Sequence, residues 1–536
     1  HLGLKSAGRG DLWTYHDPAV RVASVYGSGG QTDVLSQWTY SYPDPIRIAV
    51  ATDELLAMAA GAAQPQQVMK MTQIIWYRGQ TAPLPKRPED ALPFQARWEK
   101  DQPDAPFITI APMHLREAFW TKIARPIKGI MYHGWQSLVP CETPGAYCFT
   151  HPQTQHELAR LVRRVVEPLG PTLLQVPGVK SDVAVLESFA SQMFARRGTY
   201  GWGGSWLGDA YHAMLYAHLQ PEIVFDETIA TRGLDGFKVL VMADCDVLTQ
   251  SVAERVKSFQ AKGGLIVGDD RLAPAIQPDL LLTPYQRTGR GDKDKAAILA
   301  IAAELRKQLD ARYRRYVDSS HPEVIPYLRR HRNADYVFLV NDRREYGQYV
   351  GQHGIVMENG LPSEAVVSVN RPDGFVYDLV GGREVAVRRE GGRLLFDVAL
   401  GPCDGALYLV SPQPIQSCRI RCPQTAARGS TARCTFEVID AEDRPVQAVI
   451  PLEVTIRDSD GRPAEFSGYY AAADGKTEVV LDIGPNDPVG TWQIECRELA
   501  SGRTAVQSLR VPGPDPWPPK AGPLPKAAAN AVQPQG

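Results

Sequence analysis

The sequence predicts a multidomain protein with α/β and all-β parts: a partial (β/α) barrel, an open doubly wound α/β domain and two β-sandwich modules. The N-terminal part alternates helices that carry an apolar stripe with short apolar strands, which is typical of parallel sheets. The C-terminal part holds short strands with period-two alternation, separated by turns, which indicates antiparallel sandwiches. A chain of 536 residues is also too long for a single hydrophobic core.

The segment 107–135 carries the clearest helix-to-strand pattern. Pro112 is tolerated in the first turn of a helix, and the apolar residues that follow it fall on one helix face. Residues 129–131 then form a short apolar strand, and polar and aromatic residues follow that strand. A helix outside a strand, with side-chain chemistry where the strand ends, is the repeating unit of a (β/α) barrel. The apolar helix positions are Leu115, Ala118, Phe119 and Ile123.

Two further strands are expected before this unit, at residues 20–26 and 68–76. We interpret the GSGG sequence at 27–30 as a tight turn rather than a phosphate loop, because no lysine or helix start follows it. Thr52 is expected to cap a short helix that ends at Gly61. Three strands do not fill a barrel of eight. Because the chain begins with His1, we expect a missing N-terminal part rather than a vestigial barrel.

The next region reads as a doubly wound sheet, with strands expected at 182–186, 222–225, 237–242 and 264–267 and helices between them. Cys245 follows the third strand, but the sequence around it lacks the Gly-x-Cys-x-Gly elbow of a nucleophile. Asp269 and Asp270 after the fourth strand are interpreted as a solvated pair, with a metal site as the alternative. We therefore predict neither a metal nor a cofactor.

Two β-rich modules follow, at 322–412 and 413–512, and the Pro- and Ala-rich residues 513–536 are expected to be disordered. Cys434 and Cys496 have about the spacing of the inter-sheet bridge in an immunoglobulin-like sandwich. The alternative is a pair of buried thiols. A disulfide there would indicate an oxidising compartment.

Composition excludes several classes of function. The formal net charge is −2 and 22% of residues are charged, so the chain lacks the basic surface of a nucleic-acid-binding protein. No apolar run is long enough to span a membrane, and no signal peptide is visible.

The order of these parts resembles the beta-galactosidases of glycoside hydrolase family 42 over roughly residues 1–412. The resemblance is carried by HLREAFWTKIARPIKGIMYHGW, VAVLESF, LDGFKVLVMADCDVLT and VKSFQAKGGLIVGDD. It implies that residues 1–178 are the C-terminal part of a (β/α)8 barrel, that 179–321 form an amidotransferase-like trimerisation domain without amidotransferase chemistry, and that 322–412 form a small β domain. It also implies a homo-oligomer, a trimer, that acts on β-linked sugars. The last module looks like the macroglobulin or immunoglobulin modules of extracellular proteins, so we expect an extracytoplasmic protein that is periplasmic, surface-bound or secreted.

Aromatic and polar residues follow two of the expected barrel strands, on the face where barrels carry their sites. Flat rings can stack on a pyranose, and the polar side chains can bond to its hydroxyls. The alternative for the aromatic residues, Trp76 among them, is a place in the core. Trp202 and Trp206 are further candidates for sugar contact, with packing against the next helix as their alternative. The predicted carbohydrate-binding residues are Trp76, Tyr77, Arg78, Gln80, Tyr132, His133, Trp135 and Gln136.

Catalysis in the resembling family uses two carboxyl groups about 5 Å apart. The family's acid/base follows the fourth barrel strand, which this chain lacks, and its nucleophile is a glutamate after the seventh strand, where this chain has Trp76, Tyr77 and Arg78. Glu142 is the preferred catalytic candidate over Asp17, Asp33 and Glu99. Three functions remain open: a glycoside hydrolase-like enzyme, an inactive carbohydrate-binding protein on a degenerate barrel, and a structural surface protein.

Overall fold

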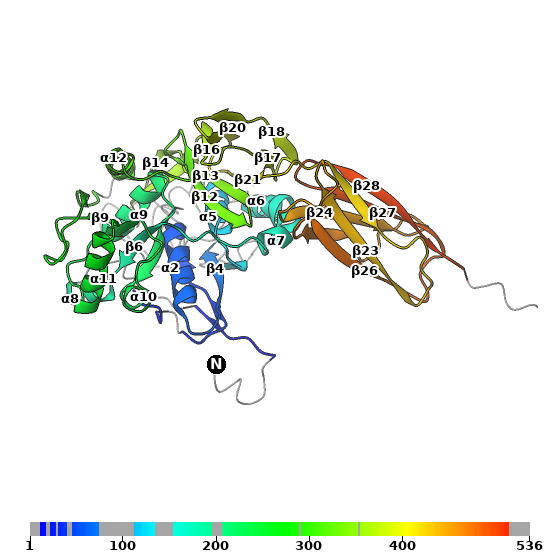
Figure 1. The fold of residues 1–536 in the computed structure, drawn as a ribbon, viewed down its shortest axis with the longest axis horizontal. Helices are drawn as coiled ribbons and strands as arrows, with labels where there is room; N and C mark the ends of the chain where they lie inside the picture. The colour runs from blue at the N-terminus through cyan, green and yellow to red at the C-terminus, as the bar shows by residue number, and fades with distance from the viewer. Residues whose placement is uncertain are drawn as a thin grey trace, which may run out of the picture.

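The computed structural model describes residues 11–17, 22–27, 30–39, 46–73, 112–133, 154–195, 206–288, 291–351 and 354–513. Within these ranges the protein is a mixed α/β molecule with several separate β-sheets. In Figure 1 the part with β6 and α11 lies at the left end of the long axis, α2 and β4 lie in the middle below β16 and β20, and the C-terminal sandwich lies at the right end. No helix among the described residues combines the length and the apolar character that a membrane span requires.

The first sheet is parallel and open. Its order is β1-β2-β4-β5, and β3 pairs with β4 beyond the end of β2. Among the described residues β1 and β5 each pair on one side only, so the described part of the sheet is open at both edges. Its strands are β1 (Tyr15–His16), β2 (Val34–Leu35), β3 (Trp38–Thr39), β4 (Gln67–Gln73) and β5 (Gly129–His133), and its helices are α2 (Arg47–Gly61), α5 (Pro112–Ile123), α6 (Thr154–Leu161), the π-helical turn η3 (Val162–Val166) and α7 (Glu167–Leu173).

Two expectations for this region are wrong. Residues 22–27 form bends and turns instead of a strand, and the chain closes tightly at Gly27, whose amide donates to the Ser24 carbonyl at 2.9 Å. The strands on either side of this turn have two residues each, too few to show an alternating pattern. Thr52 does not cap α2, because the apolar run that starts at Ile48 extends the helix upstream. The Thr52 hydroxyl instead donates to the Ile48 carbonyl inside the helix, at 2.5 Å.

The second sheet is also parallel, in the order β10-β9-β8-β6-β7. Alternate residues of its strands enter two different cores: Val183 and Val185 face one side, and Ala184 and Leu186 face the other. Both faces are therefore covered by helices, as in a doubly wound sheet. The elements are β6 (Val183–Glu187), α8 (Phe189–Ala195), α9 (Trp206–Tyr216), β7 (Glu222–Phe225), α10 (Asp226–Arg232), β8 (Val239–Met242), α11 (Gln250–Ala261), β9 (Leu265–Gly268), β10 (Leu280–Leu281) and α12 (Gly291–Leu309).

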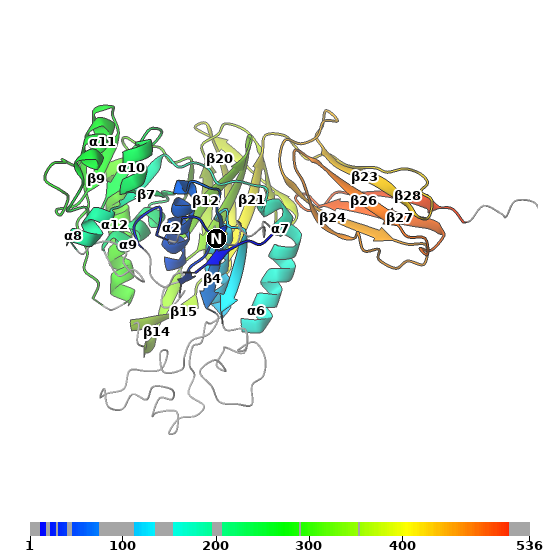
Figure 2. The ribbon, with the colours of Figure 1, turned by 90° about the horizontal axis from the view of Figure 1, so that it is seen from below.

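The third part is an antiparallel sandwich of two sheets, β11-β16-β20-β19 and β12-β13-β21-β17-β18. A hairpin, β14–β15, projects from it past the helices (Figure 2) and contacts α5 and α12. The strands are β11 (Val317–Ser319), β12 (Val324–His331), β13 (Ala334–Asn341), β14 (Arg344–Gly351), β15 (Gly354–Gly360), β16 (Ser363–Val369), β17 (Phe375–Asp378), β18 (Arg383–Val385), β19 (Arg388–Glu390), β20 (Arg393–Leu400) and β21 (Gly405–Ser411).

The fourth part is a second sandwich, with sheets β22-β23-β26 and β25-β24-β27-β28. Its apolar core is continuous with that of α5 to α7 and of β13 and β21. Tyr336 on β13 joins the two sandwiches, since its hydroxyl donates to the Val449 carbonyl at 2.8 Å and accepts from the Val449 amide at 2.7 Å. The strands are β22 (Ser417–Arg421), β23 (Ser430–Ile439), β24 (Ile450–Arg457), β25 (Gly468–Ala472), β26 (Lys476–Ile483), β27 (Gly490–Glu498) and β28 (Thr504–Val511).

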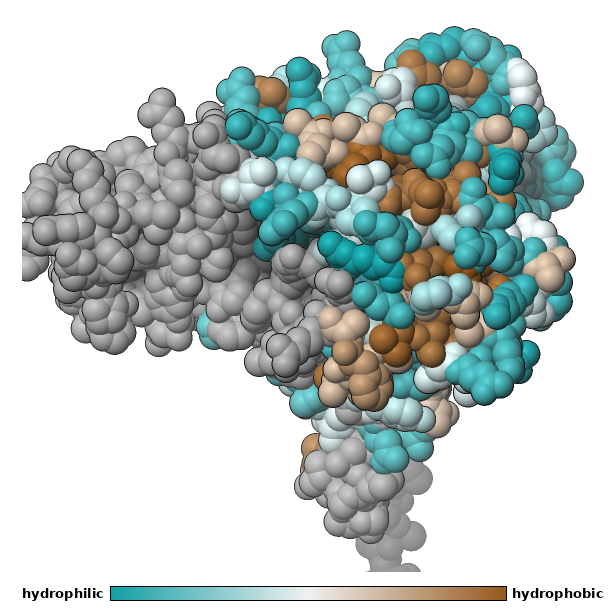
Figure 3. Space-filling view, turned by 90° about the vertical axis from the view of Figure 1, so that its left-hand side faces the viewer, coloured by the Kyte–Doolittle hydropathy of each residue, from teal (hydrophilic) through white to brown (hydrophobic). Residues whose placement is uncertain are grey.

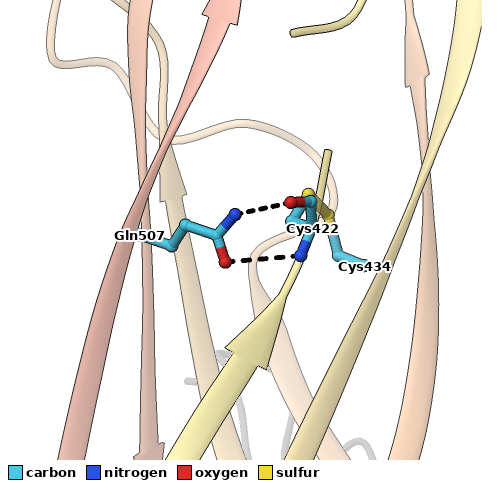
Figure 4. The surroundings of a disulfide bond; sticks show 3 residues. All are labelled: Cys422, Cys434 and Gln507. Atoms are coloured by element: carbon cyan, nitrogen blue, oxygen red, sulfur yellow. Dashed lines mark hydrogen bonds between the residues drawn. A yellow bond between two sulfur atoms is a disulfide. The ribbon is translucent and has the colours of Figure 1, made fainter. Parts of the chain in front are cut away.

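The expected bridge between Cys434 and Cys496 is not formed. Cys434 instead bonds to Cys422, and Gln507 on β28 holds the backbone of Cys422 through its side-chain amide (Figure 4). The register explains this pairing: Arg421 lies opposite Thr435, so the next residue along β22 meets Cys434.

Candidate functional site

The carboxyl ends of β3, β4 and β5 meet at one edge of the first sheet, whereas β1 and β2 end level with Val68, five residues before the end of β4. His16 lies opposite Leu35, Thr39 opposite Thr72, and Gln73 opposite His133. Ligand sites of open and closed parallel α/β sheets lie at this edge, because the strands end there together.

The structure describes two of the predicted site residues, Tyr132 and His133, which are neighbours at the end of β5. Their strand is paired with β4, after which the other predicted group begins. The remaining predicted residues lie outside the described residues: Trp76, Tyr77, Arg78, Gln80, Trp135, Gln136 and the catalytic candidate Glu142.

Tyr132 points toward the helices. Together with Phe119 and Leu158 it lines an apolar cavity of about 260 Å³ between β5 and the helices α5 to α7. The Lys122 ammonium lies 4.7 Å from the centre of its ring, and burial raises the pKa of its hydroxyl. Within the described part of the chain that hydroxyl has no hydrogen-bond partner. Because strand residues alternate, His133 projects from the opposite face of β5.

A polar cluster at the ends of β1 and β2 was not predicted. Tyr15, Asp17, Ser36 and Gln37 belong to it. Partial burial raises the pKa of Tyr15, the neighbouring Ser36 side chain lowers it, and the Asp17 carboxylate raises it again. The Gln37 amide oxygen is buried and has no partner among the described residues. Lys70 on β4 is fully buried and donates to the Gln37 carbonyl, which fixes the backbone of this cluster.

The two acidic candidates that the structure describes flank the short strands β1 and β2. Asp33 precedes β2, where the Thr14 amide and hydroxyl donate to its Oδ2 at 2.7 and 3.0 Å, so it is a structural residue of the amino edge. Asp17 directly follows β1, whose last residue is level with Val68 of β4, and its Oδ1 is buried without a partner among the described residues. A polar pair directly after the apolar dipeptide Val34–Leu35 was the only sequence signal for this cluster.

The carboxyl edge of the second sheet is occupied by its own hydrogen bonds. Asp269 accepts from the Trp206 indole and from the Asp244 amide, both at 2.8 Å, so Trp206 packs inside this domain. Burial and the carboxylates around it, Asp226 first, raise the pKa of Cys245 well above its ordinary value, so it stays a thiol. Within the described ranges no group of three or more His, Cys, Asp or Glu residues could hold a metal ion.

No protein-family model and no curated protein matches the chain. Among solved structures the chain is similar to an alpha-L-fucosidase (isoenzyme 2) from Paenibacillus thiaminolyticus, with 13% identity, a TM-score of 0.47, and coverage of 74% of this chain and 67% of that one. It is similar to a catalytic mutant of a GH42 beta-galactosidase from G. stearothermophilus, with 13% identity, a TM-score of 0.44 and coverage of 71% and 60%. It is also similar to a rhamnosidase from Novosphingobium sp. PP1Y, with 10% identity, a TM-score of 0.43 and coverage of 93% and 50%. The chain thus spans 60% of the beta-galactosidase and half of the rhamnosidase.

Proposed function

We propose that this chain is a glycoside hydrolase-like protein that binds β-linked sugars at the carboxyl edge of the first sheet. The observation that carries the proposal is the pairing of Gln73 with His133, the last described residues of β4 and β5. The two aromatic and polar groups of the sequence follow these two strands, so they start from neighbouring points of one edge. In this proposal the sheet is the C-terminal part of a (β/α) barrel, with α2, α5 and α6 as its outer helices.

Binding is tested by tryptophan fluorescence and calorimetry with a panel of β-galactosides and β-glucosides. Trp76→Ala should weaken binding at least tenfold, the loss expected for a stacked aromatic anchor. Trp13→Ala is the matched control, because Trp13 is 63% exposed and precedes β1, at the opposite edge of the sheet. Saturable binding that both variants weaken equally, or no saturable binding to any member of the panel, would contradict the proposal.

The second candidate function is sugar binding without cleavage. The absence of a carboxylate at Trp76, Tyr77 and Arg78 favours it, since a retaining hydrolase needs a second carboxyl group. Asp17 joins Glu142 as an acidic candidate. Turnover of aryl β-glycosides that is abolished in Asp17→Asn or in Glu142→Gln, with sugar binding retained, would identify the enzyme. Binding without turnover would identify the carbohydrate-binding protein.

We further propose that the protein assembles as a homo-oligomer, a trimer, outside the cytoplasm. The exposed apolar side chains of α8 support a subunit contact, because Met193 and Phe194 are 56% and 81% exposed. Figure 3 shows apolar residues scattered among hydrophilic ones on this side of the molecule. The bond between Cys422 and Cys434 supports an oxidising compartment. Light scattering of the wild type and of Phe194→Glu tests the assembly, and monomers in both would overturn it.

A further inference from the structure

Four cysteines gather in the C-terminal sandwich, and two of them are free. Cys422, which directly follows β22, and Cys434 on the neighbouring strand β23 form a disulfide. Cys418 and Cys496 are reduced and buried. The sandwich thus holds a disulfide and a dithiol within one apolar core.

The two free thiols face each other across the sandwich. Cys418 is on β22, at the edge of one sheet, and Cys496 is on β27, inside the other sheet. β22 lies against β27 and β28, which brings the two residues into the same part of the core. Cys418 lies beside Cys496, and this neighbour together with burial raises the pKa of the Cys496 thiol. The Cys418 sulfur also lies 3.5 Å from the Arg503 carbonyl oxygen, just before β28.

The existing disulfide does not compete for these thiols. Cys418 is four residues before Cys422, which is about 13 Å along an extended chain. Its cross-strand neighbour on β23 is Val438, four residues beyond Cys434. Each sulfur pair therefore has its own place: one joins two strands of a single sheet, and the other spans the two sheets.

We propose that Cys418 and Cys496 form a second disulfide, an inter-sheet staple, when the protein folds in an oxidising compartment. The Cys422–Cys434 bond requires an environment in which thiols in contact are oxidised. Two adjacent thiols in the same module meet the same oxidant during folding. The staple joins the edge strand β22 to β27 and encloses β23 to β26, so it ties the first strand of the module to its last hairpin.

The oxidant is a small-molecule disulfide or the disulfide of a thiol oxidoreductase. One cysteine thiolate attacks a sulfur of the oxidant and releases a thiol, and the second thiolate then displaces the other thiol. Two electrons and two protons leave the protein, one S–S bond forms, and the oxidant's S–S bond is reduced to two thiols. Because the folded core buries both sulfurs, the exchange takes place before the two sheets close.

Disulfide mapping of the refolded full chain tests the staple. The reduced, unfolded chain is refolded with reduced and oxidised glutathione, free thiols are alkylated under denaturing conditions, and tryptic peptides are identified by mass spectrometry. Trypsin cuts after Arg419, Arg421, Arg433 and Arg497, so the four cysteines fall on four different peptides, and fragmentation distinguishes Cys418 from Cys403 on the peptide 394–419. We expect the peptide with Cys418 to be joined to the peptide with Cys496, two hydrogens lighter than the sum of the two. Alkylated Cys418 and Cys496, or a link from Cys434 to Cys496, would overturn the proposal.

Two variants distinguish a disulfide between Cys418 and Cys496 from a non-covalent contact between the two thiols. Cys496→Ser should leave Cys418 fully alkylated and the Cys422–Cys434 link intact, whereas Cys245→Ser, a buried thiol of the second sheet, should leave both links in place. If Cys496→Ser fails to fold, resistance to reduction decides instead. The wild-type link should survive dithiothreitol under native conditions and be reduced in urea. Reduction at equal rates in both conditions would contradict a bond buried between the sheets.

Discussion

Arg125 and Asp53 form a bidentate ion pair inside the protein. Nε of Arg125 donates to Oδ1 of Asp53 at 2.8 Å, and Nη2 donates to Oδ2 at 2.9 Å. The Tyr211 hydroxyl donates to the same carboxylate, and the guanidinium lies 4.7 Å from the centre of the Tyr327 ring. The pair therefore joins α2 and the end of α5 to α9 of the second sheet and to β12 of the first sandwich. Three domains therefore contact one buried ion pair.

Asp53→Asn should destabilise the protein strongly. The substitution removes the negative charge and leaves the buried Arg125 cation without compensation, which costs about 3–5 kcal/mol. Urea unfolding followed by tryptophan fluorescence measures the loss. Asp235→Asn is the control, because Asp235 and its partner Lys262 are both largely exposed and their pair contributes less than about 1 kcal/mol. Equal stability of the two variants would contradict the role of the pair.

His212 should make the protein sensitive to mild acid. Burial first, and then the positive charge of Arg287, lower its pKa to about 3. The unfolded state takes up a proton near pH 6.5 and the folded state does not, so stability falls as the pH drops through 6.5. One such group accounts for a loss of about 2 kcal/mol between pH 7 and pH 5.

The matched variants for this prediction are His212→Leu and His156→Leu. The first should reduce the loss between pH 7 and pH 5 by about 2 kcal/mol, whatever its stability at pH 7. The second changes an exposed residue of α6 and should leave the loss as in the wild type. An unchanged pH dependence in His212→Leu would show that this histidine is not held neutral.

Lys122 should make the stability of the protein depend on pH in the alkaline range. Burial lowers the pKa of its ammonium to about 7, while its amine group donates to the Thr72 hydroxyl at 2.5 Å. Between pH 7 and 9 the unfolded chain holds the proton and the folded chain releases it, so wild-type stability rises with pH. Relative to Lys122→Met, which does not titrate, the wild type should gain about 2 kcal/mol over this range. Lys128→Met, at an exposed position, should track the wild type, and parallel curves for all three proteins would refute the prediction.

Gly405→Ala should weaken the contact between α5 and the first sandwich. A Cβ at this position would lie 2.3 Å from Cγ of Trp120, whose indole donates to Oδ1 of Asp404 at 2.9 Å. The ring is fully packed, so the variant should lose about 1–3 kcal/mol, measured by chemical unfolding. Gly208→Ala is the control: no atom of the described residues is found within 4 Å of its Cβ position in α9, and alanine favours the helix. A stable Gly405→Ala variant would mean that Trp120 can move aside.

The second sheet was predictable from the sequence because its strands hold unbroken apolar runs, VAVL and VLVM among them, buried on both faces. The first sheet was only partly predictable from the sequence. β1, β2 and β3 have two residues each, and their pairing with one another and with β4 depends on residues far apart in the chain. No local pattern specifies such strands, and for this reason the cluster of Tyr15, Asp17, Ser36 and Gln37 was missed.

Two other features of the structure have physical reasons of their own. Tyr132 shares a face of β5 with Ile130, and that alternation already places it toward the helices, although its hydroxyl suggests a polar site. The cysteine pairing could not be read from spacing, because four cysteines allow three connectivities. It took the register of β22 on β23 to select Cys422 as the partner of Cys434.

The hydrogen bonds of the Tyr336 hydroxyl and the apolar core around it determine whether the C-terminal sandwich can be removed. A module that is connected through a flexible linker can be deleted without destabilising the neighbouring domains. Here α7 packs on β24 and β25, and the apolar core runs without a break from α5 into the last sandwich. Truncation after β21 would expose to water the face of α7 that packs on β24 and β25. The C-terminal sandwich therefore shares its core with the rest of the protein. We expect calorimetry to show the sandwich and the preceding domains unfolding in a single transition.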